Sequence, residues 1–211
     1  MGSPLTALRA LLKNYFVAII GAAIVAFLLR VYVMEAFRIP TDLMAPTLLS
    51  GDHIFVNKLA YTAFLGGQTP ERGDVVVFSM PSDPTKDYIK RVIGLAGDRV
   101  EIRDRKILLN GETISHLIDA DTNEERLGER KFTVQWTSAA PESRNMLEVT
   151  VPPDNVFVLG DHRAKGQDSR TWGFLPSSAL KGRATFVWFS MGTGKGLEEG
   201  VRWSRIFTKV K

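Results

Sequence analysis

Hydroxyl and amine side chains that could act together lie in two short stretches of the sequence. The stretch "RIPTDLMAPTLLSGD", residues 38–52, contains the hydroxyl residues Thr41, Thr47 and Ser50. The stretch "DYIKRVIGL", residues 87–95, contains Lys90 among apolar residues. A hydroxyl attacks a carbonyl when a base takes its proton, and an amine buried among apolar groups has the lowered pKa that this requires. Lys90 is therefore suited to act as a general base, but for a lone lysine on a strand a solvated or snorkelling side chain is the more common alternative.

The composition excludes several other kinds of chemistry. The chain has no cysteine, so it offers no thiol nucleophile and no cysteine metal site. Its three histidines, His53, His116 and His162, lack the HExxH spacing of a zinc site. The 27 basic and 23 acidic residues are scattered, without a basic run interleaved with aromatic residues. We therefore expect no metal, no cofactor and no nucleic acid, and we expect attraction to an anionic lipid surface.

Short apolar runs separated by turn residues predict a mostly antiparallel β fold. The runs are rich in β-branched and aromatic residues, and they cover residues 73–80, 87–95, 98–103, 106–114, 131–136, 155–161 and 183–190. Asn110 and Gly111 predict a tight hairpin, since both tolerate the positive φ that such a turn needs. Residues 119–130 are dense in charge and predict a loop or the rim of an inserted subdomain.

Residues 14–29 form an uncharged apolar run between Lys13 and Arg30. As a helix this run is about 24 Å long, and snorkelling of the two flanking cations extends it toward the ~30 Å of a bilayer core. The run predicts one membrane-spanning helix. A buried core helix is one alternative, and a removable signal peptide is another that lacks a small-x-small cleavage site. Arg9 and Lys13 precede the run, so the positive-inside rule favours a cytoplasmic N-terminus.

Several stretches resemble, in order and spacing, the conserved boxes of bacterial type I signal peptidases (leader peptidases, peptidase family S26). They are "IPTDLMAPTLLSGD", "NKLAYTAF", "GDVVVF", "DYIKRVIGLAGDRV", "GDHRAKGQDSRTWGFLP" and "GRATFVWF". The resemblance implies a membrane-bound endopeptidase that removes signal peptides with a serine nucleophile and a lysine general base. It also implies an antiparallel β-sheet catalytic domain with an inserted β subdomain, anchored by one N-terminal transmembrane helix.

The same resemblance gives expected domain boundaries and an expected location. Residues 1–36 form a cytoplasmic stub and transmembrane anchor, and residues 37–211 form an extracytoplasmic signal-peptidase-like β domain with a subdomain inserted at about 101–148. The expected location is the bacterial inner (cytoplasmic) membrane, crossed once. The expected partners are the signal peptides of secreted preproteins and the lipid bilayer.

Individual residues match functional positions of the family, and two depart from its pattern. Lys90 matches the catalytic lysine, and Thr41 matches a hydroxyl position that helps to bind the oxyanion. The matching supporting positions are Arg91, Asp161, Asp168 and Arg170. Leu43 stands where the family has its nucleophilic serine. Gly166 stands where the family commonly has a serine that orients the lysine.

Three functions stay open at this point. The first is a signal peptidase homologue that acts on or binds signal peptides but is catalytically impaired by Leu43. The second is an active peptidase with Thr41 as nucleophile and Lys90 as general base. In an extended segment residues two apart lie about 6.6 Å from each other, and Pro40 and Pro46 resist the slide that would move Thr41 into place. The third is a membrane-anchored structural or regulatory partner, so whether the chain is an enzyme stays open.

Overall fold

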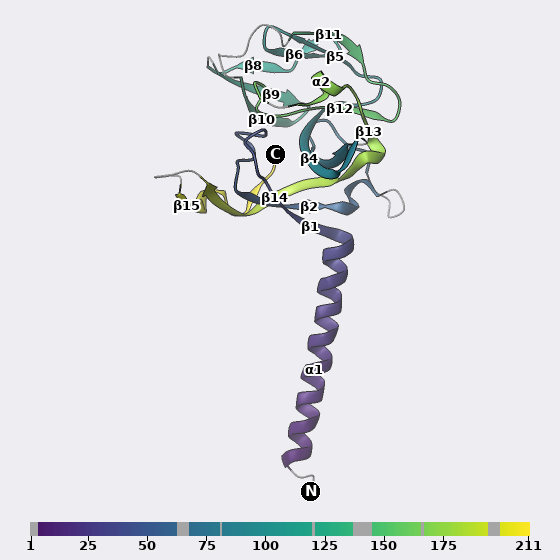
Figure 1. Cartoon of the computed structure of the whole chain (residues 1–211), viewed down its shortest axis with the longest axis vertical. Helices are drawn as coiled ribbons and strands as arrows, with labels where there is room; N and C mark the ends of the chain where they lie inside the picture. The colour runs from purple at the N-terminus through teal and green to yellow at the C-terminus, as the bar shows by residue number, and fades with distance from the viewer. Residues whose placement is uncertain are drawn as a thin grey trace.

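A single long helix, α1 (Pro4–Leu28), projects away from a body of β-strands (Figure 1). The structure is a computed structural model, and it describes residues 4–62, 68–80, 82–119, 121–136, 145–165, 167–193 and 199–211. A short π-helical turn, η1 (Leu29–Val33), leads from α1 directly into the first strand. Within the described residues, we find no helix whose length and apolar character suffice to cross a membrane.

The part of the body nearest α1 is built on one nine-stranded sheet. Its main path runs β1-β2-β14-β3-β4-β12-β13, and β15 and β16 pair with β14. The strands are β1 (Met34–Arg38), β2 (Asp52–Asn57), β3 (Val75–Met80), β4 (Asp83–Gly94), β12 (Asn155–Leu159), β13 (Leu175–Pro176), β14 (Leu180–Thr193), β15 (Glu199–Val201) and β16 (Thr208–Lys209). Their pairings are antiparallel.

Two smaller sheets lie at the end of the body farthest from α1 (Figure 1). One has the order β11-β5-β6-β7 and the other the order β10-β9-β8. Their strands are β5 (Arg99–Arg103), β6 (Lys106–Leu109), β7 (Glu112–Thr113), β8 (Ser115–Leu117), β9 (Thr122–Leu127), β10 (Arg130–Gln135) and β11 (Met146–Thr150). The remaining helical turns are α2 (Ser169–Trp172), η2 (Lys58–Tyr61), η4 (Ser177–Ala179) and η5 (Trp203–Arg205). The division into a main domain and a subdomain at about 101–148 stays a prediction.

The predicted antiparallel β architecture is confirmed, and so is the predicted hairpin. Asn110 has φ 55° and Gly111 has φ 87°, as the turn between β6 and β7 requires. The loop alternative for residues 119–130 is wrong where Thr122–Leu127 form β9. Along β9 the buried positions alternate with exposed ones, but one of them is the charged Glu125. Because a charged residue occupies one of the buried positions, the sequence lacks the alternation of apolar and polar residues that predicts a strand.

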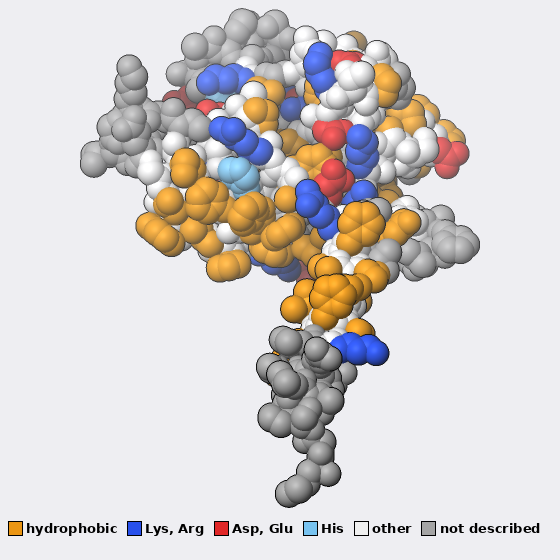
Figure 2. All heavy atoms as spheres, turned by 60° about the horizontal axis from the view of Figure 1, so that its bottom comes forward, with side chains coloured by type: hydrophobic (Ala, Val, Ile, Leu, Met, Phe, Trp, Pro, Cys, Tyr) orange, Lys and Arg blue, Asp and Glu red, His pale blue; other side chains and the backbone are white. Residues whose placement is uncertain are grey.

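Aromatic side chains gather on the face of the body from which α1 departs. Figure 2 shows a broad hydrophobic area on this face, beside the base of the helix. Phe55 packs against Phe186 and Trp188 with ring centroids 5.2 and 5.7 Å apart. Phe207 lies next to Phe186 and is 78% exposed. This face therefore presents large apolar rings outward, close to the exposed apolar side chains of α1.

Candidate active site

The segment that contains Leu43 is fixed to the body by three buried anchors. Ile39, Met44 and Leu48 are almost completely buried in one apolar cluster with residues of β2, β3 and β14. These anchors leave Thr41 exposed and Leu43 half-buried at the surface between them. Burying such side chains is worth about 1.5–3 kcal/mol each, so the segment has a defined position.

The segment is bent, and the expectation of an extended chain between Thr41 and Leu43 is wrong. Consecutive turns occupy residues 43–47. The amide of Ala45 donates to the carbonyl of Asp42 at 3.1 Å, and the amide of Leu48 donates to that of Met44 at 2.9 Å. Side chains two residues apart in a turn do not keep the separation that they have in a strand. The distance argument against Thr41 as a nucleophile therefore no longer applies.

Strand β4 places Lys90 in the interior. Lys90 lies opposite Val76 of the buried strand β3, and only 3% of its surface is exposed. This burial lowers the pKa of the amine, because the charged form loses its hydration. The charge of Asp168 opposes the lowering, that of Arg170 adds to it, and that of Asp161 opposes it. Among the described residues, none forms a hydrogen bond or an ion pair with Nζ of Lys90.

Lys90, Leu43 and Thr41 line one cavity, which we call the lysine groove. Its volume is about 420 Å³, and its other walls come from residues 39–40, Met44 and residues 86–89. The stretch at residues 38–52 and the stretch at residues 87–95 therefore lie on opposite sides of the same cavity. A Cβ atom added to Gly160 would lie 2.8 Å from the carbonyl oxygen of Leu43 and 3.5 Å from Nζ of Lys90. This glycine therefore lets the backbone of Leu43 and the amine approach the same point.

Arg91 connects the strand of Lys90 to several distant parts of the chain. Its Nε and Nη2 donate to the two carboxylate oxygens of Asp161 at 2.8 and 2.6 Å, and both side chains are fully buried. The hydroxyl of Thr47 donates to Asp161 at 2.5 Å and accepts from Arg91 at 3.2 Å. Nη1 of Arg91 donates to the carbonyls of Gly73 and Lys211. The network ties the Leu43 segment to β4, and a role for Thr47 in it was not predicted from the sequence.

Asp168 and Arg170 form a second support beside the groove. Arg170 donates to the carboxylate of Asp168 through Nε at 2.8 Å and Nη2 at 2.6 Å. Asp168 also caps α2 and accepts from the amide of Gly160 at 3.1 Å. The pair therefore fixes the glycine against which Leu43 and Lys90 rest. Gly166, the other position singled out in the sequence, lies outside the described residues.

Position 43 supplies the lysine groove with no proton donor. An amine with a lowered pKa can accept a proton from a hydroxyl near neutral pH, whereas the hydrocarbon side chain of Leu43 has no proton to give. Two lining residues carry a hydroxyl, the aliphatic one of Thr41 and the phenolic one of Tyr88, and Thr41 is the one on the same segment as Leu43. Among the described residues, no group of three histidine or acidic side chains is placed to hold a metal ion.

Comparisons with known proteins agree on one family. The family model described as "Signal peptidase, peptidase S26" matches residues 12–189. Signal peptidase I of Pseudomonas aeruginosa is 31% identical over 208 residues, covering 85% of this chain and 73% of that protein. A probable signal peptidase of Synechocystis is 36% identical over 176 residues, covering 81% of this chain and 69% of that protein. A crystal structure of a signal peptidase I from Enterococcus faecalis matches with 30% identity and a TM-score of 0.38, over 55% of this chain and 97% of that chain. The chain belongs to the signal peptidase family, peptidase S26.

Proposed function

We propose that this protein is a membrane-anchored signal peptidase homologue that binds signal peptides of preproteins in the lysine groove and has little or no peptidase activity. The observation that carries the proposal is that Leu43 and Lys90 line the same groove while Leu43 has no nucleophilic atom. Family membership supports the substrate class. Lys90 takes the general-base position, and Arg91, Asp161, Asp168 and Arg170 brace it.

The groove suits a short stretch of extended peptide with small side chains. Its volume of about 420 Å³ is too small for a folded domain but is sufficient for a few small residues. Its walls are two backbone stretches, residues 39–44 and 86–90, and the second belongs to strand β4. Peptides bind such walls by backbone hydrogen bonds, with side chains entering pockets alternately.

Membrane attachment through residues 14–29 is part of the proposal. The run is uncharged, and its side chains from residue 15 to residue 27 are exposed: Tyr15 is 66% exposed and Phe27 is 64% exposed. Helix α1 extends away from the body, and the aromatic face lies beside its base (Figures 1 and 2). Apolar surface of this kind gains free energy when a bilayer covers it. We place the N-terminus in the cytoplasm and the β body outside the bacterial inner membrane.

Restoring the missing hydroxyls tests the proposal. We expect wild-type protein in detergent to bind an Ala-x-Ala peptide and leave a labelled preprotein uncut. Leu43→Ser should produce cleavage, and Leu43→Ser with Gly166→Ser should exceed it, because a base needs both the right geometry and the right protonation state. Adding Lys90→Ala should remove the gain, by about 10²–10⁴-fold. Rapid preprotein cleavage by the wild type would contradict the proposal.

An active peptidase that uses Thr41 is the second candidate. Thr41 is exposed, lines the lysine groove, and sits on a bent segment rather than an extended one. If it is the nucleophile, wild-type protein cuts preprotein and Thr41→Val stops cleavage without weakening peptide binding. A protein that neither cuts nor binds the Ala-x-Ala peptide would instead have a structural or regulatory role in the membrane.

A further inference from the structure

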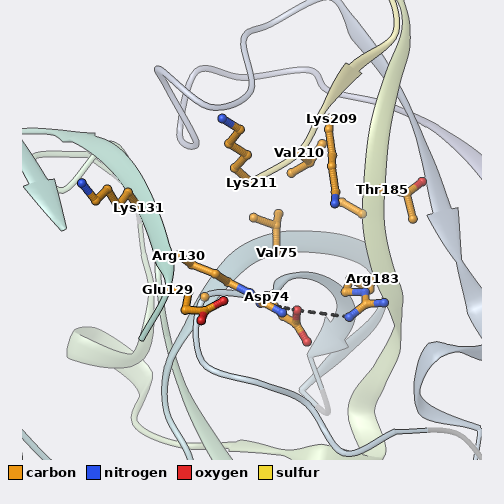
Figure 3. A pocket seen from close by; sticks show the side chains of 12 residues that line it. Asp74, Val75, Glu129, Arg130, Lys131, Arg183, Thr185, Lys209, Val210 and Lys211 are labelled. Atoms are coloured by element: carbon orange, nitrogen blue, oxygen red, sulfur yellow. Dashed lines mark hydrogen bonds and ion pairs between the residues drawn. The ribbon is translucent and has the colours of Figure 1, made fainter. Parts of the chain in front are cut away.

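A second cavity, which we call the basic cavity, lies apart from the lysine groove and shares no lining residue with it. Its volume is about 530 Å³. Four segments that are far apart in the sequence form its walls (Figure 3). They are residues 73–75 up to the start of β3, residues 129–131 at the start of β10, residues 183–185 in the first half of β14, and residues 209–211 at and after β16. Nothing in the proposed peptide-binding function uses this cavity.

Positive charge dominates the lining of the basic cavity. The cations are Arg130, Lys131, Arg183, Lys209 and Lys211. The acids are Asp74 and Glu129. The lining side chains are five cations and two carboxylates, and a third carboxylate, that of Glu71, is paired with Arg130, so the side chains leave a surplus of two positive charges around one opening. Like charges held around a cavity repel one another, and a bound anion relieves that repulsion.

The carboxylate of Asp74 does not neutralise the charges of the lysines, because it already accepts hydrogen bonds from other side chains. It is buried and accepts from Nη1 of Arg130 at 2.6 Å and from the hydroxyl of Tyr61 at 2.8 Å. Nη1 of Arg183 lies 3.5 Å from the same carboxylate, and a dashed line joins these two side chains in Figure 3. Nη2 of Arg130 is also paired with Glu71, so Arg130 is compensated by two carboxylates, whereas Arg183 has only its longer contact with Asp74 among the described residues. In the part of the chain that the structure describes, the amines of Lys131, Lys209 and Lys211 form no ion pair or hydrogen bond.

The base of the basic cavity is apolar and is formed by strands of the nine-stranded sheet. Val75 is 3% exposed and Ala184 is 5% exposed, and both belong to the central sheet. Val210 adds a third apolar surface between the two C-terminal lysines. Lysine and arginine side chains thus surround an apolar base, and the volume of the cavity is larger than a single phosphate group needs. Such a site favours an anion with several charged oxygens over a halide ion.

We propose that the basic cavity is a binding site for a multivalent phosphate anion. The guanidinium of Arg183 offers paired donors to phosphate oxygens, and the lysine amines supply point charges around them. The headgroup of an anionic phospholipid and a soluble phosphate compound share this chemistry. The site is independent of the activity proposed for the lysine groove.

The basic cavity is joined to the lysine groove by one buried side chain. Nη1 of Arg91 donates to the carbonyl of Gly73 at 2.8 Å and to that of Lys211 at 2.7 Å, and both acceptors belong to residues that line the basic cavity. Arg91 is the neighbour of Lys90 in β4. An anion that orders the wall of the basic cavity therefore acts on the side chain that braces the strand of Lys90.

Calorimetric titration of the full chain with pyrophosphate, in a neutral detergent and at constant ionic strength, tests the site. We expect binding at one site per chain, weakened about tenfold or more by Lys209→Gln with Lys211→Gln. The matched control is Lys106→Gln with Lys165→Gln, which removes the same charge from exposed lysines outside the basic cavity. The control should bind pyrophosphate as the wild type does.

Two results would overturn the proposal, and one further arm identifies the source of the anion. Equal weakening in both double variants would mean general attraction to a basic protein, and absence of pyrophosphate binding would mean that there is no site.

The same titration is then repeated in phosphatidylcholine nanodiscs with and without phosphatidylglycerol. Competition by phosphatidylglycerol, lost in Lys209→Gln with Lys211→Gln, supports a lipid headgroup as the occupant, whereas unchanged pyrophosphate binding supports a soluble phosphate compound.

Discussion

At the scale of single residues, the protonation of Lys90 is the property that most affects both stability and chemistry. Its pKa is lowered in the folded protein from the ordinary value of 10.5. At a pH between the lowered pKa of the folded protein and the ordinary value of 10.5, Lys90 carries a proton in the unfolded chain but not in the folded one. The free energy of unfolding therefore rises with pH in this range. Lys90→Met removes this dependence.

We therefore expect the difference in stability between wild type and Lys90→Met to change with pH in one direction. The wild type should gain stability relative to Lys90→Met as the pH rises from the lowered pKa toward 10.5, and the difference should be constant above that value. Denaturant unfolding at several pH values measures this, and NMR titration of the labelled amine gives the pKa directly. A difference that is independent of pH would mean that the amine keeps an ordinary pKa.

Gly160 is the residue whose size the groove depends on most. Gly160→Ala would place a methyl group 2.8 Å from the carbonyl oxygen of Leu43, which is backbone and is also held by the amide of His162. We expect a loss of about 1–3 kcal/mol in the free energy of unfolding, together with weaker binding of the Ala-x-Ala peptide. Gly21→Ala, where no atom lies within 4 Å of the added methyl, is the control. Normal peptide binding by Gly160→Ala would contradict the assigned geometry.

At the scale of elements, one buried ion pair joins β9 to the loop after β12. Nη2 of Arg163 donates to Glu125 at 2.7 Å, and both side chains are fully buried. Burial raises the pKa of Glu125 and lowers that of Arg163, because it disfavours both charged forms. The charge of each side chain opposes this effect on the other. The loop after β12 carries Asp168 and contacts the Leu43 segment through His162, so β9 supports the groove from a distance.

Removing one partner of this pair should cost more than removing both. Glu125→Leu or Arg163→Met alone leaves a buried charge without its counter-charge, at about 3–5 kcal/mol of unfolding free energy. The double variant should recover much of that loss, because similar apolar volumes replace the pair. Denaturant unfolding of the four proteins completes the cycle. Strictly additive losses would mean that the two side chains do not interact.

The sequence predicted the strands whose patterns are local and missed those set by tertiary contacts. β3, β5 and β12 lie within predicted runs because their apolar residues are continuous or alternate. The strand at Thr122–Leu127 was not predicted, since its buried charge is compensated by Arg163, which is distant in sequence. For the site, the resemblance identified Lys90 and Asp168 by position. The bend around Leu43 and the part played by Thr47 depend on packing and on Asp161, which spacing does not encode.

At the scale of the whole molecule, the proposed membrane attachment and orientation can be tested by labelling single introduced cysteines, because the chain has none of its own. Leu147 is 87% exposed in the sheet farthest from α1 (Figure 1). We expect Leu147→Cys to react with a membrane-impermeant maleimide in intact spheroplasts. Ser3→Cys should react only after lysis, because Arg9 and Lys13 favour a cytoplasmic N-terminus. The reverse labelling pattern would place the β body in the cytoplasm.

The hydrogen bonds of Arg91 also imply an order in which contacts form as the chain is synthesised and folds. A growing chain emerges from its N-terminus, and Arg91 is made 70 residues before Asp161 and 120 residues before Lys211. Contacts over such separations form late, because they wait for intervening chain to close into loops. Until then β4 stays hydrated, and the neighbouring amine of Lys90 keeps its proton. The lowering of the pKa of Lys90 therefore develops late in the folding of a newly made chain, after the residues as far as Lys211 have been added.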